Sequence, residues 1–369
     1  MLEILFWVFI ASTGIQFFFL FLVLVAISLY KKPAIASVEI PGISVIISAK
    51  NEADNLKKLI PLLLNQQFKA YEIILLDDKS TDETYDYAIE LDHKEEKFKL
   101  VRIDSTPDHI NNKKYALTLG IRAAKYDHLV FTDADCLPDS EFWLEDMSNG
   151  FSSDKIKFVL GYSQYFKSRG LLNYFIKYET MLTALHYIGI GLLGNPYMGV
   201  GRNIAYRKSF FLENNGFGKY QDVVGGDDDL LVNQYAKRKN TKFVLSSNSI
   251  VYSNPKEKLS EFILQKTRHL SVGKHYRGTD KLLLGLLSFS KIIFWISFIA
   301  AIMSGYQTYF VAGGFVLVMV SLLTVLLVLK KKTGDKSSIW MLPFLDFIFI
   351  FYYISTGLKV LFTKKVRWK

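Results

Sequence analysis

Two aspartates at the end of a short apolar segment are the residues of this 369-residue chain that most directly suggest chemistry. Residues 128–132 have the pattern of a buried strand, and Asp133 and Asp135 follow at its exit. Ligands of open α/β sheets bind beyond the carboxyl ends of the strands, where one or two carboxylates and a substrate's phosphates can hold Mg²⁺ or Mn²⁺. Aspartates in this position also serve as turn residues or helix caps, so the cation site needs support from the rest of the chain.

The preceding sequence provides a scaffold for such a site. Residues 43–48, 71–78 and 98–103 are predicted strands, with a helical pattern after each of them. This alternation predicts an α/β fold with a mostly parallel sheet covered on both faces. Glu52 follows the first strand and Asp78 ends the second, so polar residues gather at the edge where a nucleotide would bind.

A second acidic group, Asp227, Asp228 and Asp229, directly precedes a helical pattern. One carboxylate is enough to cap a helix and to compensate its dipole. Three adjacent acids repel one another, so we expect a positive or protonatable group beside them.

A third group, Gln265, Arg268 and His269, falls on one face of a predicted helix. Without further support it also fits a solvated basic helix close to a membrane.

Between the first acidic group and the second, residues 157–166 and 199–207 have the pattern of strands. Residues 170–194 form an apolar stretch with interspersed polar positions, which fits an amphipathic helix on the membrane or against the spans, or an ordinary core helix.

Four apolar runs, at about 4–30, 282–303, 308–329 and 339–362, are each long enough to cross a bilayer as a helix. The first begins with Glu3 rather than a basic region and is too long for a signal peptide, so we expect a retained anchor. The predicted organisation is an anchor at 1–32, a polar domain at 33–280 and a membrane region of two to three helices at 281–369. The single Cys136 excludes an intramolecular disulfide.

The net charge of +10 comes with basic clusters at residues 31–32, 330–332 and 364–367, each beside an apolar run. A nucleic-acid-binding protein would carry its basic residues on a folded surface with interleaved aromatics, so we expect no nucleic-acid partner. The clusters follow the positive-inside rule and predict a multi-pass protein of the inner (plasma) membrane with a cytoplasmic domain. Basic residues flank the last run on both sides, and it contains Pro343 and Asp346, so an interfacial segment and a fourth span both remain open.

In this order, the motifs resemble those of the membrane-bound family 2 glycosyltransferases with a GT-A fold, which include cellulose, chitin and hyaluronan synthases and ceramide glucosyltransferases. The resemblance covers about residues 40–280. Its motifs are residues 48–52, 77–82, 113–120, the Asp133–Asp135 pair, 226–230 and 265–269.

The resemblance implies a nucleotide-sugar donor, with Asp78 and Glu52 near the base and Lys113 near the phosphates. It further implies that Asp135, with Asp133, ligates Mg²⁺ or Mn²⁺ on the donor's diphosphate. The family's Glu-Asp-x-Asp-Leu pattern places the catalytic base at Asp227, but Gly226 stands where the pattern has glutamate. Asp228 is therefore the second choice. One base and a single displacement imply inversion at the anomeric carbon.

Gln265 and Arg268 would contact the diphosphate, and His269 replaces a tryptophan that usually contributes to the acceptor platform. Three or four spans are few for a polysaccharide channel. The favoured function is therefore transfer of one or a few sugars, from a UDP-sugar, to a lipid or lipid-linked acceptor. The alternatives are a processive polysaccharide synthase, which would need more spans from a second copy, and an inactive nucleotide-binding scaffold.

Overall fold

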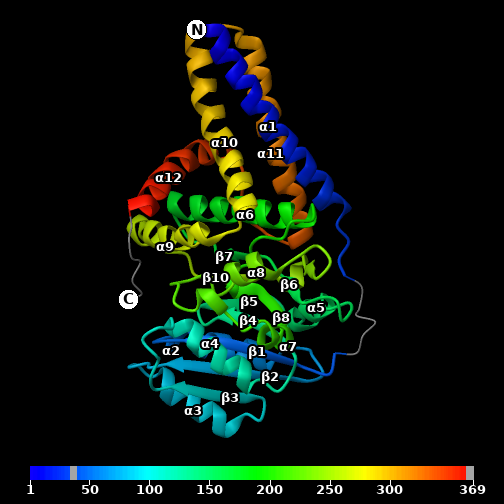
Figure 1. The fold of residues 1–369 in the computed structure, drawn as a ribbon, viewed down its shortest axis with the longest axis vertical. Helices are drawn as coiled ribbons and strands as arrows, with labels where there is room; N and C mark the ends of the chain where they lie inside the picture. The colour runs from blue at the N-terminus through cyan, green and yellow to red at the C-terminus, as the bar shows by residue number, and fades with distance from the viewer. Residues whose placement is uncertain (34–39, 363–369) are drawn as a thin grey trace.

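A computed structural model describes residues 1–33 and 40–362, so the basic cluster at residues 364–367 lies outside the described residues. The molecule is elongated, with a sheet-containing domain at one end and a bundle of long helices at the other (Figure 1). This arrangement confirms the predicted α/β domain flanked by apolar helices.

The central sheet has seven strands in the order β3-β2-β1-β4-β8-β6-β9. Its strands are β1 (Ile43–Ala49), β2 (Tyr71–Asp78), β3 (Phe98–Ile103), β4 (His128–Asp133), β6 (Phe158–Leu160), β8 (Ile204–Arg207) and β9 (Thr241–Phe243). β3, β2, β1 and β4 run parallel, whereas β8 is antiparallel to both of its neighbours. The sheet is thus mostly parallel, as the alternating pattern predicts.

Both faces of the parallel half are covered by helices. Successive residues of β1 point to opposite faces: Ile46 belongs to the apolar cluster that includes α4, and Val45 and Ile47 belong to the cluster that includes α2 and α5. The covering helices are α2 (Ala53–Leu64), α3 (Thr84–Lys94), α4 (Asn112–Ala123) and α5 (Trp143–Asn149). Such two-sided burial explains why these strands are continuous apolar runs.

A second sheet of three short strands lies beyond β4, in the order β5 (Cys136–Pro138), β10 (Val251–Ser253) and β7 (Ser163–Tyr165). The prediction of one strand over residues 157–166 was wrong, because this segment forms β6 in the central sheet and β7 in the second one. The chain changes sheets at Gly161, where a Cβ would lie 2.5 Å from the side chain of Asn203.

The predicted strand over residues 199–207 was also too long. Its first half contains a 3-10 turn (Gly201–Asn203), and β8 begins only at Ile204. The N–H of Gly201 donates to Oδ2 of Asp228 rather than to a neighbouring strand, which explains why strand pairing starts later.

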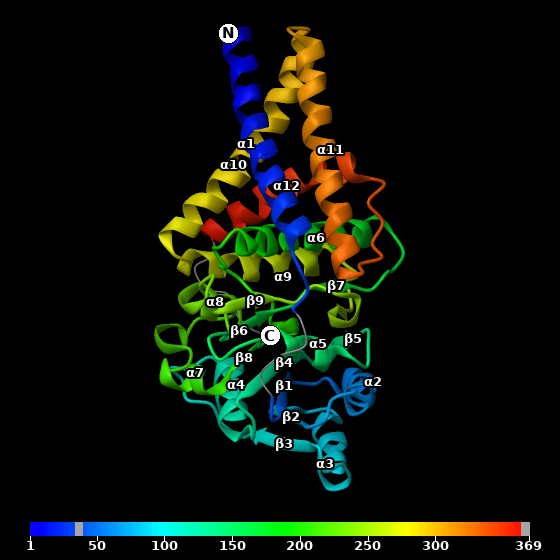
Figure 2. The same cartoon turned by 90° about the vertical axis from the view of Figure 1, so that its right-hand side faces the viewer.

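Three long helices, α1 (Leu2–Leu29), α10 (Gly278–Ser304) and α11 (Thr308–Thr333), stand together and extend away from the sheets (Figures 1 and 2). With α12 (Leu342–Phe362) they are the four helices of the described chain that are long and apolar enough to cross a membrane. α12 leaves the direction of the bundle and lies obliquely at its base, against α9 (Leu259–Val272) (Figure 1). Asp346 of α12 is buried and accepts hydrogen bonds from Tyr178, Lys291 and Trp295.

α6 (Leu171–Leu192) lies across the base of the bundle, between the bundle and the two sheets (Figure 1). It contacts α1, α11, α12 and β7, and most of its side chains are buried. Both expectations for residues 170–194 are therefore partly met, because the helix packs against the long helices and is also part of the core.

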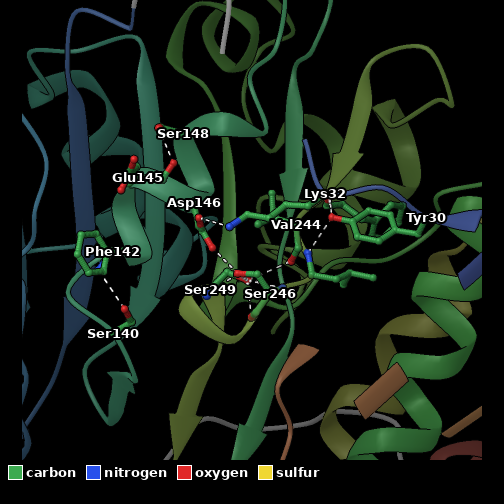
Figure 3. A network of polar contacts seen from close by, with 12 residues as sticks. Tyr30, Lys32, Ser140, Phe142, Glu145, Asp146, Ser148, Val244, Ser246 and Ser249 are labelled. Carbon is green, nitrogen blue, oxygen red and sulfur yellow. Dashed lines mark hydrogen bonds and ion pairs between the residues drawn. The ribbon is translucent and has the colours of Figure 1, made fainter. Parts of the chain in front are cut away.

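The lower end of α1 is fixed to the domain by a polar network (Figure 3). The hydroxyl of Tyr30 donates to the carbonyl of Phe243 (3.1 Å) and accepts from the N–H of Leu245 (3.0 Å). Lys32 forms an ion pair of 2.6 Å with the buried Asp146, which also accepts a hydrogen bond from Ser246. Lys32 thus connects the end of α1 to the domain.

We predict that Asp146→Ala lowers the free energy of unfolding by about 1–3 kcal/mol, since it leaves Lys32 and Ser246 without their common acceptor. Denaturant unfolding in detergent, followed by tryptophan fluorescence, measures this. Glu145→Ala is the matched control, because Glu145 is the adjacent carboxylate of α5 and should change stability by less than about 0.5 kcal/mol. Equal losses in the two variants would contradict the role of the network.

Candidate active site

The carboxyl ends of β1, β2 and β4 lie side by side, because these strands are parallel neighbours. Ala49 pairs with Asp77 across β1 and β2, and Ser48 pairs with Asp133 across β1 and β4. The register therefore brings the polar residues that follow the three strands to one edge of the sheet.

Two loops at this edge are locked together by residues with left-handed backbone conformations. Asn51 has φ +57° and Lys79 has φ +58°. The N–H of Asn51 donates to Ser80 Oγ (3.0 Å), and Asn51 Oδ1 accepts from the N–H of Thr81 (2.8 Å). Sequence reasoning overlooked Asn51; the signal was an asparagine just beyond a strand, since asparagine tolerates positive φ better than most residues.

Asp78 is 7% exposed, and its Oδ1 is buried without a hydrogen-bond donor among the described residues. The nearest cation is Lys79 Nζ, 3.5 Å from this oxygen. Glu52 lies on the same cavity, where burial and the charges of Asp135 and Asp133 raise its pKa. A buried carboxylate oxygen without a donor fits a ligand that brings an N–H, such as a nucleotide base.

Asp133 and Asp135 fit a hard divalent cation. Their carboxylate oxygens and Cys136 Sγ lie within 4.8 Å of one another. Burial, with the charges of the two aspartates, raises the pKa of Cys136 well above its usual value, so the thiol stays protonated and donates to Asp135 Oδ1 (3.3 Å). The available ligands are thus carboxylate oxygens, the type that Mg²⁺ and Mn²⁺ prefer.

Lys113, in the first turn of α4, joins the two acidic groups. Its Nζ lies 3.0 Å from Asp133 Oδ1 and 3.1 Å from Asp227 Oδ2. Burial alone would lower the pKa of Lys113, but Asp133, Asp227 and Asp228 hold it well above its ordinary value. The ammonium group therefore stays charged and provides the cation that three adjacent acids require.

The acidic segment has a turn that only glycine adopts readily. Gly225 and Gly226 have φ +78° and +72°, and α8 (Asp229–Tyr235) begins directly after the turn. A Cβ on Gly226 would also lie 2.6 Å from the side chain of Leu230. This geometry explains why glycine stands where the family pattern has glutamate.

The three aspartates have different partners. Asp227 contacts Lys113, and this contact lowers its pKa against the effect of burial. Both oxygens of Asp228 accept backbone N–H groups, from Asp229 and Gly201, while burial and Asp227 raise its pKa to about 6. Asp229 accepts from the hydroxyl of Tyr276 (2.7 Å). Asp227 is thus the ionised member that faces Lys113, whereas Asp228 holds the loop.

Gln265, Arg268 and His269 of α9 line the same cavity as the residues at the strand ends. Gln265 Oε1 is buried and accepts no hydrogen bond from the described residues. Burial and the neighbouring cations Lys266 and Arg268 lower the pKa of His269 well below its ordinary value, so its ring is neutral. The helix therefore presents amide, guanidinium and imidazole groups to the cavity.

Arg202 also lines this cavity and was not identified from the sequence. Its Nε donates to Ser163 Oγ (2.9 Å), and its guanidinium lies 4.5 Å from the centre of the Tyr165 ring. The available signal was an arginine directly after Gly201, because a glycine inside a strand pattern often marks a close approach of a ligand or another backbone.

All the predicted site residues line one cavity of about 1390 Å³, which continues from the strand ends to the membrane helices. They are Glu52, Asp78, Lys113, Asp133, Asp135, Asp227, Asp228, Gln265, Arg268 and His269. A site for one drug-sized ligand has about 300–1,000 Å³, so this cavity has room for two substrates.

The model of the family described as glycosyl transferase family 2 matches residues 44–213, which contain the strand-end carboxylates and Lys113. These residues, somewhat less than half of the chain, match a glycosyl transferase family 2 domain.

Among curated proteins, the chain is similar to the poly-beta-1,6-N-acetyl-D-glucosamine synthase of Staphylococcus aureus, with 30% identity over 114 residues. It is also similar to the 4,4'-diaponeurosporenoate glycosyltransferase of Staphylococcus haemolyticus, with 33% identity over 124 residues. These matches cover 31% and 34% of this chain, and only 26% and 32% of the two relatives.

Among solved structures, the chain is similar to the mannosyltransferase of Pyrobaculum calidifontis in complex with GDP-Man and Mn²⁺. The TM-score is 0.63 at 18% identity, over 99% of this chain and 100% of the other. This likeness concerns the fold, which is a GT-A fold with apolar helices at its flanks.

We predict that Gly226→Ala lowers the free energy of unfolding of the protein by about 2–4 kcal/mol, because the positive φ and the contact with Leu230 both oppose a Cβ. Gly218→Ala is the control: Gly218 has φ +48° but nothing within 4 Å of a Cβ, so only the backbone strain of about 1–2 kcal/mol applies. Denaturant unfolding compares the two, and a smaller loss in Gly226→Ala would contradict the tight turn.

Proposed function

We propose that the chain transfers a sugar from a nucleotide-sugar to a lipid or lipid-linked acceptor at the cytoplasmic face of the inner (plasma) membrane. The observation that carries this proposal is the position of Lys113, in contact with Asp133 at the strand ends and with Asp227 before α8. Cations stabilise the departing diphosphate, and the hydroxyl that displaces the diphosphate needs a base. The cavity contains candidate groups for both roles.

Donor binding is assigned to the strand ends. Asp78 Oδ1 would accept an N–H of the base, with Glu52 beside it. We infer a UDP-sugar, and a GDP-sugar is included in the test because the similar mannosyltransferase was solved with GDP-Man. Lys113, Gln265 and Arg268 would contact the diphosphate, because cationic and amide donors stabilise its charge.

Asp135, with Asp133, would hold Mg²⁺ or Mn²⁺. The bound ion would neutralise the negative charge that develops on the departing nucleoside diphosphate. The similar mannosyltransferase was solved with Mn²⁺, which supports the choice of metal.

Asp227 is the proposed base. A hydroxyl is a weak nucleophile, so its proton must pass to a carboxylate as its oxygen attacks the anomeric carbon. The bond from that carbon to the diphosphate oxygen breaks in the same step, and the sugar inverts. Asp227 suits this role better than Asp228, because both oxygens of Asp228 accept backbone N–H groups.

The membrane arrangement follows from charge and shape. The lower ends of α1 and α11 carry residues 31–32 and 330–332, and both ends lie on the side of the sheets (Figure 1). By the positive-inside rule that side is cytoplasmic. We infer three spanning helices, with α12 lying in the interface, because α12 is oblique and packs mainly on α9.

A processive polysaccharide synthase is the second candidate, favoured by the similarity to the poly-beta-1,6-N-acetyl-D-glucosamine synthase. The similarity to the diaponeurosporenoate glycosyltransferase favours a lipid acceptor instead. Product length separates these functions, because the synthase would release long polymer and the proposed transferase adds one or a few sugars.

The test is nucleoside diphosphate release by the detergent-purified protein from UDP- and GDP-sugars, with Mn²⁺ or Mg²⁺ and total membrane lipid. We predict release from one donor, abolished by a chelator and by Asp135→Ala, and reduced at least about 100-fold by Asp227→Asn. Asp86→Asn, at an exposed position of α3, is the control that should keep full activity. Undiminished release by Asp227→Asn would exclude this base, and nucleotide binding without any release would support the inactive scaffold.

A further inference from the structure

A buried polar network connects α8, which follows the acidic segment, to the start of α10. α8 lies below the start of α10 in both views (Figures 1 and 2). The first contact of this network is a hydrogen bond of 2.7 Å from the hydroxyl of Tyr276 to Asp229 Oδ2. Asp229 is 8% exposed, and its other oxygen has no hydrogen-bond partner among the described residues. The tyrosine hydroxyl therefore fixes the orientation of this carboxylate.

The second contact lies one helical turn further along α8. Asn233 Oδ1 accepts the backbone N–H of Arg277 (2.9 Å), and Asn233 Nδ2 donates to Asp280 Oδ2 (2.8 Å). Residues four apart lie on one face of a helix, so α8 is attached to the segment of residues 276–280 at two points. Two attachments one turn apart oppose rotation of α8 about its axis.

Asp280, in the first turn of α10, joins the network to a third segment. Asp280 is 1% exposed, and it accepts hydrogen bonds from Asn195 Nδ2 (2.8 Å) and Arg277 Nε (2.7 Å) as well as from Asn233. Arg277 Nη2 in turn donates to Asn195 Oδ1 and to the carbonyl of Pro196, at 3.1 Å each. A buried polar network with its hydrogen bonds formed is rigid. The start of α10 is therefore a firm support for α8.

The turn that carries Asp227 needs such a support. Gly225 and Gly226 precede it with positive φ, and two successive glycines permit many backbone conformations. Contacts on either side of the turn must therefore select one of them. Lys113 contacts Asp227 directly, and Tyr276 holds Asp229 two residues later.

We propose that Tyr276 is a positioning residue for the catalytic base. By holding Asp229, its hydroxyl fixes the turn in which Asp227 faces Lys113. The network around Asp280 connects this position to α10, a helix long and apolar enough to cross a membrane. This inference rests on the proposed function, because it takes Asp227 as the base, and it adds a residue outside the sequence motifs to the catalytic arrangement.

Tyr276→Phe removes only the hydroxyl and tests this role in the release assay. We expect kcat, expressed per nucleotide-binding site counted by titration calorimetry, to fall about tenfold, because a buried hydrogen bond to a carboxylate is lost. The KM for the donor should stay within about twofold, because the strand-end residues are unchanged. A general loss of structure would reduce the number of binding sites rather than kcat per site. An unchanged kcat per site would overturn the proposal.

Tyr220→Phe is the matched control. The hydroxyl of Tyr220 donates to the carbonyl of His275 (3.3 Å) and so bridges the same two parts of the chain, but this hydrogen bond is exposed and water can replace it. This variant should keep kcat per site within about twofold of the unmodified protein. Equal losses in Tyr220→Phe and Tyr276→Phe would overturn the role of the buried contact.

Asp229→Asn separates positioning from catalysis. Asparagine keeps a carbonyl oxygen for the hydroxyl of Tyr276 and removes the charge. Release should therefore fall by less than about tenfold, against at least about 100-fold in Asp227→Asn. A loss as large as that of Asp227→Asn would mean that Asp229 takes part in the proton transfer, and would overturn its assignment as a positioning contact.

Hydrogen exchange of the detergent-purified full chain, followed by mass spectrometry, tests the position of the turn without activity. Backbone amides of residues 224–230 should exchange at least about threefold faster in Tyr276→Phe than in the unmodified protein or Tyr220→Phe. Faster exchange in a protein that releases no nucleoside diphosphate would contradict the proposed function but support the effect of Tyr276 on the turn. Normal release by the unmodified protein with unchanged exchange in Tyr276→Phe would overturn this inference alone.

Discussion

The contact of Lys113 with two carboxylates is the interaction on which the site depends. Asp133 comes from the end of a central strand, and Asp227 comes from a turn much later in the chain. Without a cation between them these neighbouring carboxylates would repel each other, which would disfavour the position of the turn before α8 at the sheet edge. The neighbouring Lys114 adds a structural anchor, because its Nζ donates to the carbonyls of Tyr220 and Val223 just before that turn.

The same domain is joined rigidly to its membrane helices. Tyr30 and Lys32 fix α1 to the region around Asp146, as Figure 3 shows. Asp335, after α11, accepts hydrogen bonds from Tyr162 and from the side chain of Gln164. These contacts hold α1 and the segment after α11 against the sheet-containing domain.

The sequence was sufficient for the parallel sheet and for the gathering of polar residues at its edge, because apolar runs and their polar ends follow simple periodic rules. Asp78, Asp133 and Asp227 reach one cavity as expected. The sequence was insufficient where contacts between distant segments decide the structure. The expected strand is interrupted at Gly161, which packs closely against Asn203. Gly226 has a positive φ, which could not be predicted from the neighbouring residues.

The contacts of polar residues in the apolar helices also could not be predicted from the sequence. Asp346 stood out as an acid in an apolar run, but its pairing with Lys291 depends on the oblique packing of α12. His186 was visible only as a polar position in an apolar stretch, and the structure places its Nδ1 2.7 Å from the carbonyl of Leu182.

The position of a bound metal tests the central claim most directly, because residues 133–135 and 227–229 are both acidic. A structure of the protein with Mn²⁺ and the nucleoside diphosphate of its donor, with the metal located by anomalous scattering, distinguishes the two groups. The account predicts Mn²⁺ on Asp135 and Asp133, the diphosphate beside Lys113, and a metal-free Asp227 facing the acceptor side of the cavity. Mn²⁺ bound by Asp227 and Asp228 instead would contradict it.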